Sequence, residues 1–443
     1  MGHDSAQTSF NKLLSETPIR GVPADPVEIA RRLAPLGDVV ALVSATASLN
    51  GSAVSFVTAA PAEQSTALVP RGGVLEGWHS GGRAVPEWVG VVPYEAARSL
   101  ERPNWRLKQD QRGEPHHLRP SWRRYPSVIA VDPSTSRVVS IGSDASHQRS
   151  LIDAVVHPRR CRMGAELQII DEDLVEHQQR VRSVLELISR GDLYQVNIAR
   201  RITLHVKGEG LHVFEKMVSN SPTSYCCYLS FDGSAVLSTS PEEFLFASPN
   251  GRVVTRPIKG TRPRGESPDD DVRVIQELDS DAKERAELAM VIDLERNDLG
   301  RVAATGSVRV ERAPRIETHR TLHHRVAEVS AVLPTGTSWE ALVSAMFPSG
   351  SVTGAPKVRA MEVIADLETH RRGLYTGAIG YVGHGGELVL SMAIRTLTLR
   401  DEEGHYHVGG GIVADSDPLR EEEETRVKSL QLLRALEQLR AEG

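Results

Sequence analysis

The chain contains very little cysteine. Its 443 residues include three, Cys161, Cys226 and Cys227. Three cysteines are too few for a disulfide framework in a chain of this length. None of them belongs to a C-x-x-C pair or stands at the spacing of metal-binding cysteines. A disulfide-stabilised secreted domain and a thiolate metal site are therefore excluded, and we expect a reduced protein.

Long apolar runs are missing as well. No segment approaches the run of about 18 apolar residues that a transmembrane helix needs. The N-terminal sequence MGHDSAQTSF has neither the basic region nor the apolar core of a signal peptide. A formal net charge of −6 argues against nucleic-acid binding through a basic surface, although a single pocket can still be positive. We therefore expect a cytoplasmic protein that binds neither membranes nor nucleic acid.

Lysine is scarce beside arginine, since only eight of the 52 basic residues are lysine. Genomic base composition can account for this bias. A lysine inside a motif is nevertheless more informative here than usual. The reason is that lysine can lose its proton and act as a nucleophile, whereas arginine stays charged.

Hydrophobic patterning divides the chain into two regions. Short strand-like runs lie between residues 25 and 130, and the sequence becomes polar and aperiodic around 133–165. We therefore predict an N-terminal region of residues 1–150 and a catalytic region of residues 165–443. Blocks of strands with Asp-Gly and Asn-Gly turn signals alternate with long helices. This arrangement predicts an α+β fold with large antiparallel sheets.

The second region gives the clearest element predictions. Amphipathic patterns predict helices over about 171–191, 271–297, 355–367 and 418–441. The segment LVLSMAIRTLTLR at 388–400 has the composition of one strand. SYCCYLSF, AVLSTS, FLFAS and RVVTRPIKG form an expected meander.

Two pairs of glutamates stand three residues apart on expected helices. They are Glu284 with Glu287, and Glu421 with Glu424. The spacing places each pair on one helical face. Two such faces meeting would offer the oxygen ligands that Mg²⁺ prefers. A solvated helix face shows the same pattern, so spacing alone leaves both interpretations open.

The segment GGGIVADSDP at 409–418 suggests an anion site. Consecutive glycines let a backbone approach a ligand. We expect them in the strand-like run HYHVGGGIV, as a Gly-rich segment that leads into a helix capped by Ser416 or Asp417. The same helix carries Lys428. A tight strand-to-helix turn is the alternative.

Lys259 follows a strand in RPIKGT. With a lowered pKa it could act as a nucleophile, and Glu242, one hairpin earlier, could act as a general acid. His323 and His324 are further candidates for proton transfer or hydrogen bonding. Each of these residues also has an ordinary structural interpretation, such as a surface lysine at a hairpin end.

Nine segments in this order resemble the chorismate-utilising enzymes, which include anthranilate synthase large subunits, aminodeoxychorismate synthase component I, isochorismate synthases and salicylate synthases. The segments are GDLYQVNIARR, STSPEEFL, RPIKGTRPRG, DAKERAELAMVIDLERNDLGRV, SVTGAPKVRAMEVI, YTGAIGY, IRTLT, GGGIVADSDP and EEETRVK. They cover about residues 170–440. The resemblance implies two large, mainly antiparallel sheets that form a core flanked by helices.

The resemblance also implies a site. Glu287 and Glu424 would bind Mg²⁺, with Glu284 and Glu421 in support, and the metal would hold the ring carboxylate of chorismate. Nine further residues would bind the substrate. The ring carboxylate would be bound by Gly409, Gly410, Gly411 and Lys428, the enolpyruvyl carboxylate by Tyr375 and Arg395, and the ring by His324, Thr353 and Gln195.

One position separates the branches of this family. Aminodeoxychorismate synthases typically carry lysine in the PI-x-GT motif, where other branches carry alanine, and here it is Lys259. The implied mechanism is attack of Lys259 on C2 of chorismate while Glu242 protonates the departing C4 hydroxyl. Gln195 stands where relatives that add water carry a lysine base.

The implied reaction needs other proteins. No cysteine lies in a Gly-x-Cys-x-Gly motif, so ammonia would come from a separate glutamine amidotransferase. A separate aminodeoxychorismate lyase would then release 4-aminobenzoate, for folate or a secondary metabolite. The alternatives are an anthranilate synthase or 2-amino-2-deoxyisochorismate synthase large subunit, and a silent partner that only binds an amidotransferase.

Overall fold

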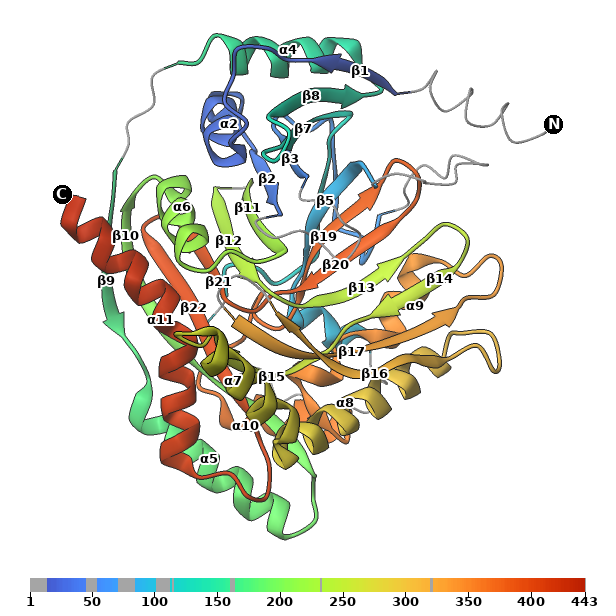
Figure 1. The fold of residues 1–443 in the computed structure, drawn as a ribbon, viewed down its shortest axis with the longest axis vertical. Helices are drawn as coiled ribbons and strands as arrows, with labels where there is room; N and C mark the ends of the chain where they lie inside the picture. The colour runs from blue at the N-terminus through green and yellow to red at the C-terminus, as the bar shows by residue number, and fades with distance from the viewer. Residues whose placement is uncertain are drawn as a thin grey trace.

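The computed structural model describes residues 14–44, 54–70, 84–100, 112–113, 115–159, 164–231, 233–318 and 322–442. Cys161 and Asp232 of the expected Asp-Gly turn lie outside these residues. Two large sheets dominate the described part of the chain (Figure 1). Every strand pair in them is antiparallel, which confirms the predicted fold class.

The first sheet, sheet A, has 12 strands within the described residues and the order β1-β8-β7-β3-β2-β11-β12-β21-β22-β10-β18, with β9 also paired to β10. Its strands are β1 (Ser15–Pro18), β2 (Val40–Val43), β3 (Ser55–Thr58), β7 (Ser127–Asp132), β8 (Arg137–Gly142), β9 (Ala165–Asp171), β10 (Gln195–Gly208), β11 (Tyr225–Phe231), β12 (Ser234–Ser240), β18 (Gly354–Ala355), β21 (Thr396–Arg400) and β22 (Glu403–Ile412).

The second sheet, sheet B, has 10 strands within the described residues and the order β15-β17-β14-β13-β20-β19-β5-β6-β4, with β16 also paired to β17. Its strands are β4 (Glu63–Ser65), β5 (Pro86–Val92), β6 (Ser121–Arg124), β13 (Glu243–Ala247), β14 (Arg252–Thr255), β15 (Ile258–Pro263), β16 (Arg309–Thr318), β17 (Leu322–Val332), β19 (Ala378–Gly383) and β20 (Leu388–Met392).

Helices cover the outer faces of the sheets. They are α2 (Pro26–Leu33), α3 (Ala97–Leu100), α4 (Ala145–Val156), α5 (Leu174–Ser189), α6 (Gly210–Asn220), α7 (Pro268–Ser280), α8 (Ala282–Gly300), α9 (Trp339–Met346), α10 (Lys357–Leu367) and α11 (Pro418–Glu442), with short 3-10 turns at Ala34–Leu36, Tyr94–Ala96 and Gly350–Val352. By the criterion of length and hydropathy, none of the helices in the described residues could cross a membrane.

The core has three parts. One apolar cluster joins sheet A to α2, α4, α6 and α11. A second joins sheet B to α5, α9 and α10. The third lies between the sheets, where Val40 and Leu229 of sheet A meet Val89 and Ile379 of sheet B. Burial of these aliphatic side chains removes apolar area from water and holds the two sheets face to face.

Strands of the N-terminal region pair with strands of the catalytic region in both sheets. In sheet A, β2 pairs with β11, and in sheet B, β5 pairs with β19. Residues before and after the predicted boundary at 150–165 therefore build the same two sheets. The exact division of the chain stays a prediction.

The expected long helix over 271–297 is two helices. Asp281 is extended, with φ −61° and ψ 110°, and separates α7 from α8. Its side chain accepts a hydrogen bond from the backbone N–H of Glu284 and so caps α8. The prediction of one helix was wrong because the Asp-x-x-Glu capping signal at 281–284 was overlooked.

The single strand expected at 388–400 is also two strands. β20 belongs to sheet B and β21 to sheet A. Arg395, with φ 49°, lies between them in the left-handed region. This turn takes the chain from one sheet to the other, and it places Arg395 where the sheets meet. The expected meander is divided in the same way, because β12 lies in sheet A and β13 in sheet B.

Candidate active site

Lys259 lies on β15, where the strand is irregular. The pairing of β15 with β17 shifts between Ile258 and Thr261, and Gly260 has φ 82°. A Cβ on Gly260 would come within 2.8 Å of Leu278 Cδ1 and 3.3 Å of Glu284 Oε2. Only glycine fits this bend, which presses β15 against α8. The Lys259 ammonium donates a hydrogen bond to the Ser351 carbonyl at 3.2 Å.

Glu242 lies in the connection from β12 to β13 and is 6% exposed. Its Oε1 is 2.9 Å from the Ser351 hydroxyl. Burial raises the pKa of Glu242 to about 7, although the Ser351 hydroxyl and the Lys259 charge act in the opposite direction. A glutamic acid with this pKa keeps its proton near neutral pH and can donate it. Ser351 therefore joins the predicted nucleophile to the predicted general acid.

The four predicted metal ligands come from α8 and α11. In Figure 1, α11 runs along the left of the sheets and α8 lies below them, and Lys283 of α8 reaches Glu421 of α11. A Cβ on Gly410 of β22 would lie 3.1 Å from Glu421 Oε2 and 3.4 Å from Glu424 Oε1. Glycine at 410 therefore leaves the space that these two carboxylates occupy.

A lysine ammonium already lies between the two helices. Lys283 Nζ is 3.8 Å from Glu287 Oε1 on its own helix and 3.6 Å from Glu421 Oε1 on α11. Burial alone would lower the pKa of Lys283, but the surrounding carboxylates, Glu421 first among them, raise it overall. This arrangement shows that the glutamates attract a cation.

Burial and neighbouring charges affect the carboxylates differently. Burial raises the pKa of Glu287 and of Glu421. Lys428, whose Nζ is 2.7 Å from Glu424 Oε1, lowers the pKa of Glu424. A divalent cation would supply the charge that Glu287 and Glu421 lack.

The donor set fits Mg²⁺, because its members are hard carboxylate oxygens on two facing helices. The carboxylates are not yet gathered around one point. Within the described residues, the group with three donor atoms inside 4.8 Å is a different one, His116, Glu403 and His405. The glutamates would therefore have to move closer together around a metal.

The His116 group lies at the β21–β22 turn. The rings of His116 and His405 stack at 4.1 Å with an angle of 15° between their planes. Stacked rings point their nitrogens side by side instead of toward one atom. Arg400 also lowers the pKa of both histidines, after burial. These features do not favour a cation there.

The three predicted glycines form the end of β22, which confirms the strand expected at HYHVGGGIV. Lys428 Nζ donates to the Gly409 carbonyl at 2.8 Å. The N–H and C=O of a strand residue point to the same side, and successive residues alternate. The amides of Gly409 and Gly411 therefore point toward the Lys428 side, whereas that of Gly410 points to β10. Two of the three predicted amides thus point to the same side as Lys428.

The predicted helix cap is confirmed. Asp417 Oδ1 accepts hydrogen bonds from the backbone N–H groups of Leu419 and Arg420, both at 3.0 Å. Ser416 instead donates to Glu421 Oε1 at 2.7 Å and so orients a predicted metal ligand. The cap and the ligand are built by consecutive residues.

Gln195 begins β10 and is 1% exposed. A Cβ on Gly411 would lie 2.3 Å from Gln195 Nε2, so glycine at 411 leaves the space that this amide occupies. Gln195 Oε1 and Asn197 Oδ1 are buried and find no hydrogen-bond partner among the described residues. Buried polar atoms without partners are costly and indicate a missing ligand or water. Asn197 was not recognised from the sequence.

Tyr375 and Arg395 come from neighbouring loops. The backbone of Thr376 donates to the Ala393 carbonyl at 2.9 Å, which places Tyr375 beside the chain that leads to Arg395. Burial lowers the pKa of Arg395, and its guanidinium makes no ion pair or hydrogen bond with a described residue. Such an arginine is suited to bind a carboxylate.

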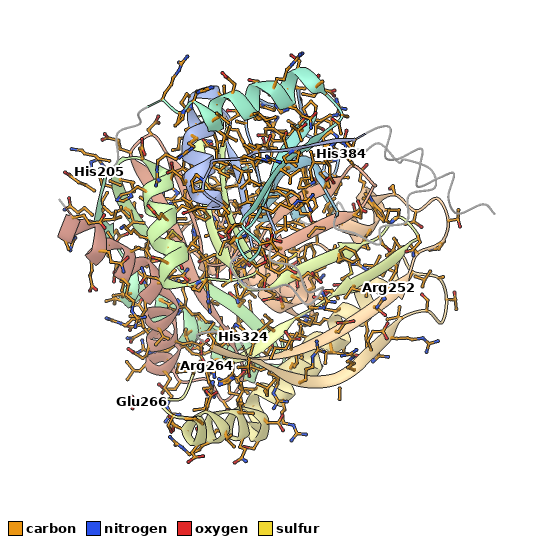
Figure 2. The ribbon with its side chains drawn as sticks, turned by 45° about the horizontal axis from the view of Figure 1, so that its top comes forward. His205, Arg252, Arg264, Glu266, His324 and His384 are labelled. Atoms are coloured by element: carbon orange, nitrogen blue, oxygen red, sulfur yellow. The ribbon has the colours of Figure 1, made fainter. Side chains whose placement is uncertain are left out.

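His324 and Thr353 are both held by short contacts. His324 is 2% exposed and its Nδ1 lies 2.8 Å from the Thr261 hydroxyl on β15. In Figure 2 it lies well inside the outline, whereas Glu266 lies near the edge. The Thr353 hydroxyl donates to the Ser349 carbonyl at 2.8 Å. His323 points elsewhere, with Nε2 2.7 Å from Asp271 Oδ1.

A family model described as "chorismate binding enzyme" matches residues 48–434. Among characterised relatives, anthranilate synthase component 1 of Aquifex aeolicus is 44% identical over 262 residues, which cover 59% of this chain and 53% of the relative. Aminodeoxychorismate synthase component 1 of Klebsiella aerogenes is 42% identical over 262 residues, which cover 59% of this chain and 58% of the relative. The matched part thus spans little more than half of these relatives.

The fold agrees. Anthranilate synthase component I from Streptococcus pneumoniae superimposes with a TM-score of 0.71 at 25% identity, over 86% of this chain and 92% of that one. The match of sequence and fold over most of the chain shows that the protein belongs to the chorismate-binding enzymes.

Proposed function

We propose that this protein aminates chorismate at C4, in the manner of aminodeoxychorismate synthase component I. The observation that carries the proposal is the position of Lys259. Its ammonium binds the Ser351 carbonyl, while the hydroxyl of the same serine binds the buried Glu242. A nucleophile and an acid therefore lie on either side of one residue, as a displacement with loss of a hydroxyl group requires.

The proposed reaction has two steps. In the first, Lys259 gives up one ammonium proton to solvent, its neutral amine bonds to C2 of chorismate, the two conjugated ring double bonds shift, and the C4–O bond breaks. Glu242 gives its proton to the departing oxygen, which leaves as water. In the second step, ammonia bonds to C4 and the two double bonds return. The C2–N bond breaks, Lys259 recovers its electron pair, and the proton lost by the new ammonium group returns to Glu242.

Mg²⁺ would be held by Glu287 and Glu424, with Glu284 and Glu421 in support, and would neutralise the ring carboxylate of chorismate. The amides of Gly409 and Gly411, together with Lys428, complete this anion site in the proposal. Arg395 and Tyr375 bind the enolpyruvyl carboxylate. The unpartnered oxygen atoms of Gln195 and Asn197 are available to accept hydrogen bonds from the substrate or from ammonia.

Anthranilate synthesis is the second candidate, because relatives with that name are as similar as those named aminodeoxychorismate synthase. The presence of Lys259 favours C4 amination, since a reaction at C2 has no use for a nucleophile that bonds to C2. The name component 1 given to these relatives suggests a second subunit. We propose that this partner is a glutamine amidotransferase that supplies ammonia.

A product assay tests the proposal. The purified protein is incubated with chorismate, Mg²⁺ and an ammonium salt, with and without an added aminodeoxychorismate lyase, and the products are identified by mass spectrometry. We expect 4-aminobenzoate only when the lyase is present. Anthranilate in either sample would assign the second candidate function. If no product forms with ammonium, the assay is repeated with an amidotransferase subunit, and continued inactivity would contradict catalysis.

A further inference from the structure

A second buried glutamate lies close to Glu242. Glu295 on α8 is 0% exposed, and its Oε1 is 2.7 Å from the Ser349 hydroxyl. The Ser349 hydroxyl is 3.0 Å from that of Ser351, which is in turn 2.9 Å from Glu242 Oε1. Four side chains therefore form one unbroken line of three short oxygen–oxygen contacts, with a carboxyl group at each end.

The number of protons in this line follows from its chemistry. Each of the three contacts needs one hydrogen atom. A serine hydroxyl has one hydrogen to donate, so Ser349 and Ser351 supply two. The third must come from a carboxyl group. If both glutamates were ionised, one contact would lack a proton, and if both were protonated, one contact would hold two. The line therefore fits one carboxylic acid and one carboxylate.

The charged groups around the line allow the proton at either end. Near Glu295, Lys357 of α10 stabilises the charged form of Glu295. Asp298, which lies on α8 with Glu295, destabilises that charged form. The Lys357 ammonium itself pairs with Asp298. Glu295 Oε2 has no hydrogen-bond partner among the described residues. No ion pair therefore fixes Glu295 in its charged form.

The other end has a comparable balance. Lys259 of β15 and Lys428 of α11 stabilise a charged Glu242, together with the backbone N–H of Ile258. Burial acts against the charge and is the larger effect at both ends, raising the pKa of each carboxyl to about 7. Two buried carboxyls with similar proton affinity and a direct hydrogen-bonded connection can exchange one proton.

We propose that Glu295 and Glu242 share one proton through Ser349 and Ser351, and that this proton reaches the leaving oxygen through Glu242 whichever carboxyl holds it. This inference rests on the proposed function, in which Glu242 is the acid. When the proton is on Glu295, Glu295 passes it to Ser349, Ser349 passes its own proton to Ser351, and Ser351 passes its own to Glu242. The negative charge thereby moves from Glu242 to Glu295, next to Lys357, and Glu242 then gives its proton to the leaving oxygen.

The path runs in reverse once ammonia has bonded to C4. The proton released from the new ammonium group enters at Glu242 and returns to Glu295. Proton number is conserved over the cycle and no other reactant is needed. Glu295 does not touch the substrate in this scheme, so it is a positioning residue for the proton of Glu242.

Infrared spectroscopy tests the shared proton without any substrate. The carboxylic-acid band is measured at pH 6.5 for the wild-type protein, for Glu242→Gln, for Glu295→Gln and for the double variant. A glutamine amide can donate the third hydrogen of the line, so either single variant should leave the other carboxyl ionised. Each single variant then loses one acid band, and the double variant loses no more. Twice the loss in the double variant, or no loss in any, would overturn the proposal.

Glu387 offers a matched control. It is 1% exposed, lies in the turn between β19 and β20, and burial likewise raises its pKa to about 7. The N–H of Met392 donates a hydrogen bond to the Glu242 carbonyl. Glu387 is five strand residues from Met392, which is a distance of about 17 Å along the strand. Glu387→Gln measures the signal of one buried acid and should leave the pH dependence of the reaction unchanged.

The pH dependence of kcat provides the second readout. Glu295→Gln removes the neighbouring charge that keeps the last proton on the pair. In this variant kcat should therefore begin to fall with rising pH at least about one pH unit earlier than in the wild type. At high pH this shift makes kcat about tenfold lower. The KM for chorismate should be unchanged. Ser349→Ala interrupts the line but keeps both carboxyls, so kcat should fall while the alkaline limb stays closer to that of the wild type. A Glu295→Gln profile identical to that of the wild type would contradict the relay.

The two arms separate this inference from the proposed function. If the wild-type protein fails to aminate chorismate, the proposed function fails, yet the infrared comparison still decides whether the proton is shared. If amination occurs and the infrared bands are additive, only the shared proton is wrong.

Discussion

Glu287 on α8 and Glu424 on α11 face ammonium groups, whereas Glu242 and Glu295 face serine hydroxyls. Lys283 and Lys428 lie within 4 Å of the first pair, and no lysine or arginine forms an ion pair with the second among the described residues. The side chains are chemically the same. What differs is how each carboxyl is compensated for leaving water: by a cation at the first pair, and by hydrogen bonds and a proton at the second pair.

This difference separates two tasks within one site. Carboxylates that are compensated by cations remain charged and can bind a metal ion. Carboxyls that are compensated by hydroxyls retain a proton and can donate it near neutral pH. Substitutions in these two groups of carboxyls should therefore affect different steps of the reaction.

The largest effect is expected when the acid of the buried pair is removed. Glu242→Gln keeps the shape and the contact with Ser351 but cannot give up a proton, so kcat should fall by about 10²- to 10⁴-fold. Mg²⁺ affinity, measured by calorimetry, should stay within about twofold because the substitution is outside the cation cluster. A variant that keeps its rate would contradict the role of Glu242 as the acid.

A substitution in the cation cluster should show the opposite pattern. Glu287→Gln removes one charge-assisted ligand, which corresponds to about 1.5–3 kcal/mol, or about 10- to 100-fold in metal affinity. High Mg²⁺ concentrations should restore much of the rate, whereas they should not restore Glu242→Gln. Unchanged Mg²⁺ binding would exclude Glu287 as a ligand.

Lys283 offers a smaller test of the same cluster. In the absence of metal its ammonium lies between Glu287 and Glu421, and it has to move when a divalent cation binds. Lys283→Gln should therefore bind Mg²⁺ or Mn²⁺ more tightly, by roughly fivefold for a partly exposed charge. Without metal, the variant should also unfold at a lower temperature.

Arg285→Gln is the matched control for this prediction. It removes the same charge from an exposed position two residues further along α8. Calorimetry should give a metal affinity close to that of the wild type. Equal tightening in the two variants would mean that only the overall charge matters, and not the position of Lys283.

The last prediction concerns stability and not the reaction. Burial raises the pKa of Glu295 from 4.5 to about 7. The folded state thus holds this proton more tightly than the unfolded state, and the associated stability is complete below pH 4.5 and is lost as the pH rises to about 7. As the pH rises between these values, the free energy of unfolding should fall less for Glu295→Gln than for the wild type, by up to about 1.4 kcal/mol per pH unit. Urea unfolding at pH 5 and pH 7 measures the difference, and parallel curves would contradict burial of an ionisable Glu295.

Sequence patterns predicted the α+β class and the segments that build the site, because long motifs carry Lys259 and the glutamate pairs. They did not predict how segments divide between the sheets. The left-handed turn at Arg395 is decided by tertiary packing, which overrides the strand character of 388–400. The strand at HYHVGGGIV was predicted, but the sequence does not show that its glycines leave the space in which Gln195 and the α11 carboxylates lie.

Glu295 could have been found from the sequence. It shares one helical face with Leu288, Val291 and Leu299, all of which are buried. A glutamate at an apolar position of this stripe indicates a buried carboxyl. Its link to Glu242, in contrast, passes through two serines on a turn far along the chain, and no periodicity reports such a contact.

The most direct test of the account compares the products of the wild-type protein and Lys259→Ala with chorismate, Mg²⁺ and ¹⁵N-labelled ammonium. NMR then locates the labelled nitrogen on the ring. We expect the wild type to place it at C4, and Lys259→Ala to lose C4 amination by on the order of a thousandfold or more, with any remaining product aminated at C2. C4 amination at the wild-type rate by Lys259→Ala would contradict the covalent role of Lys259, and a label at C2 in the wild-type product would contradict the proposed reaction.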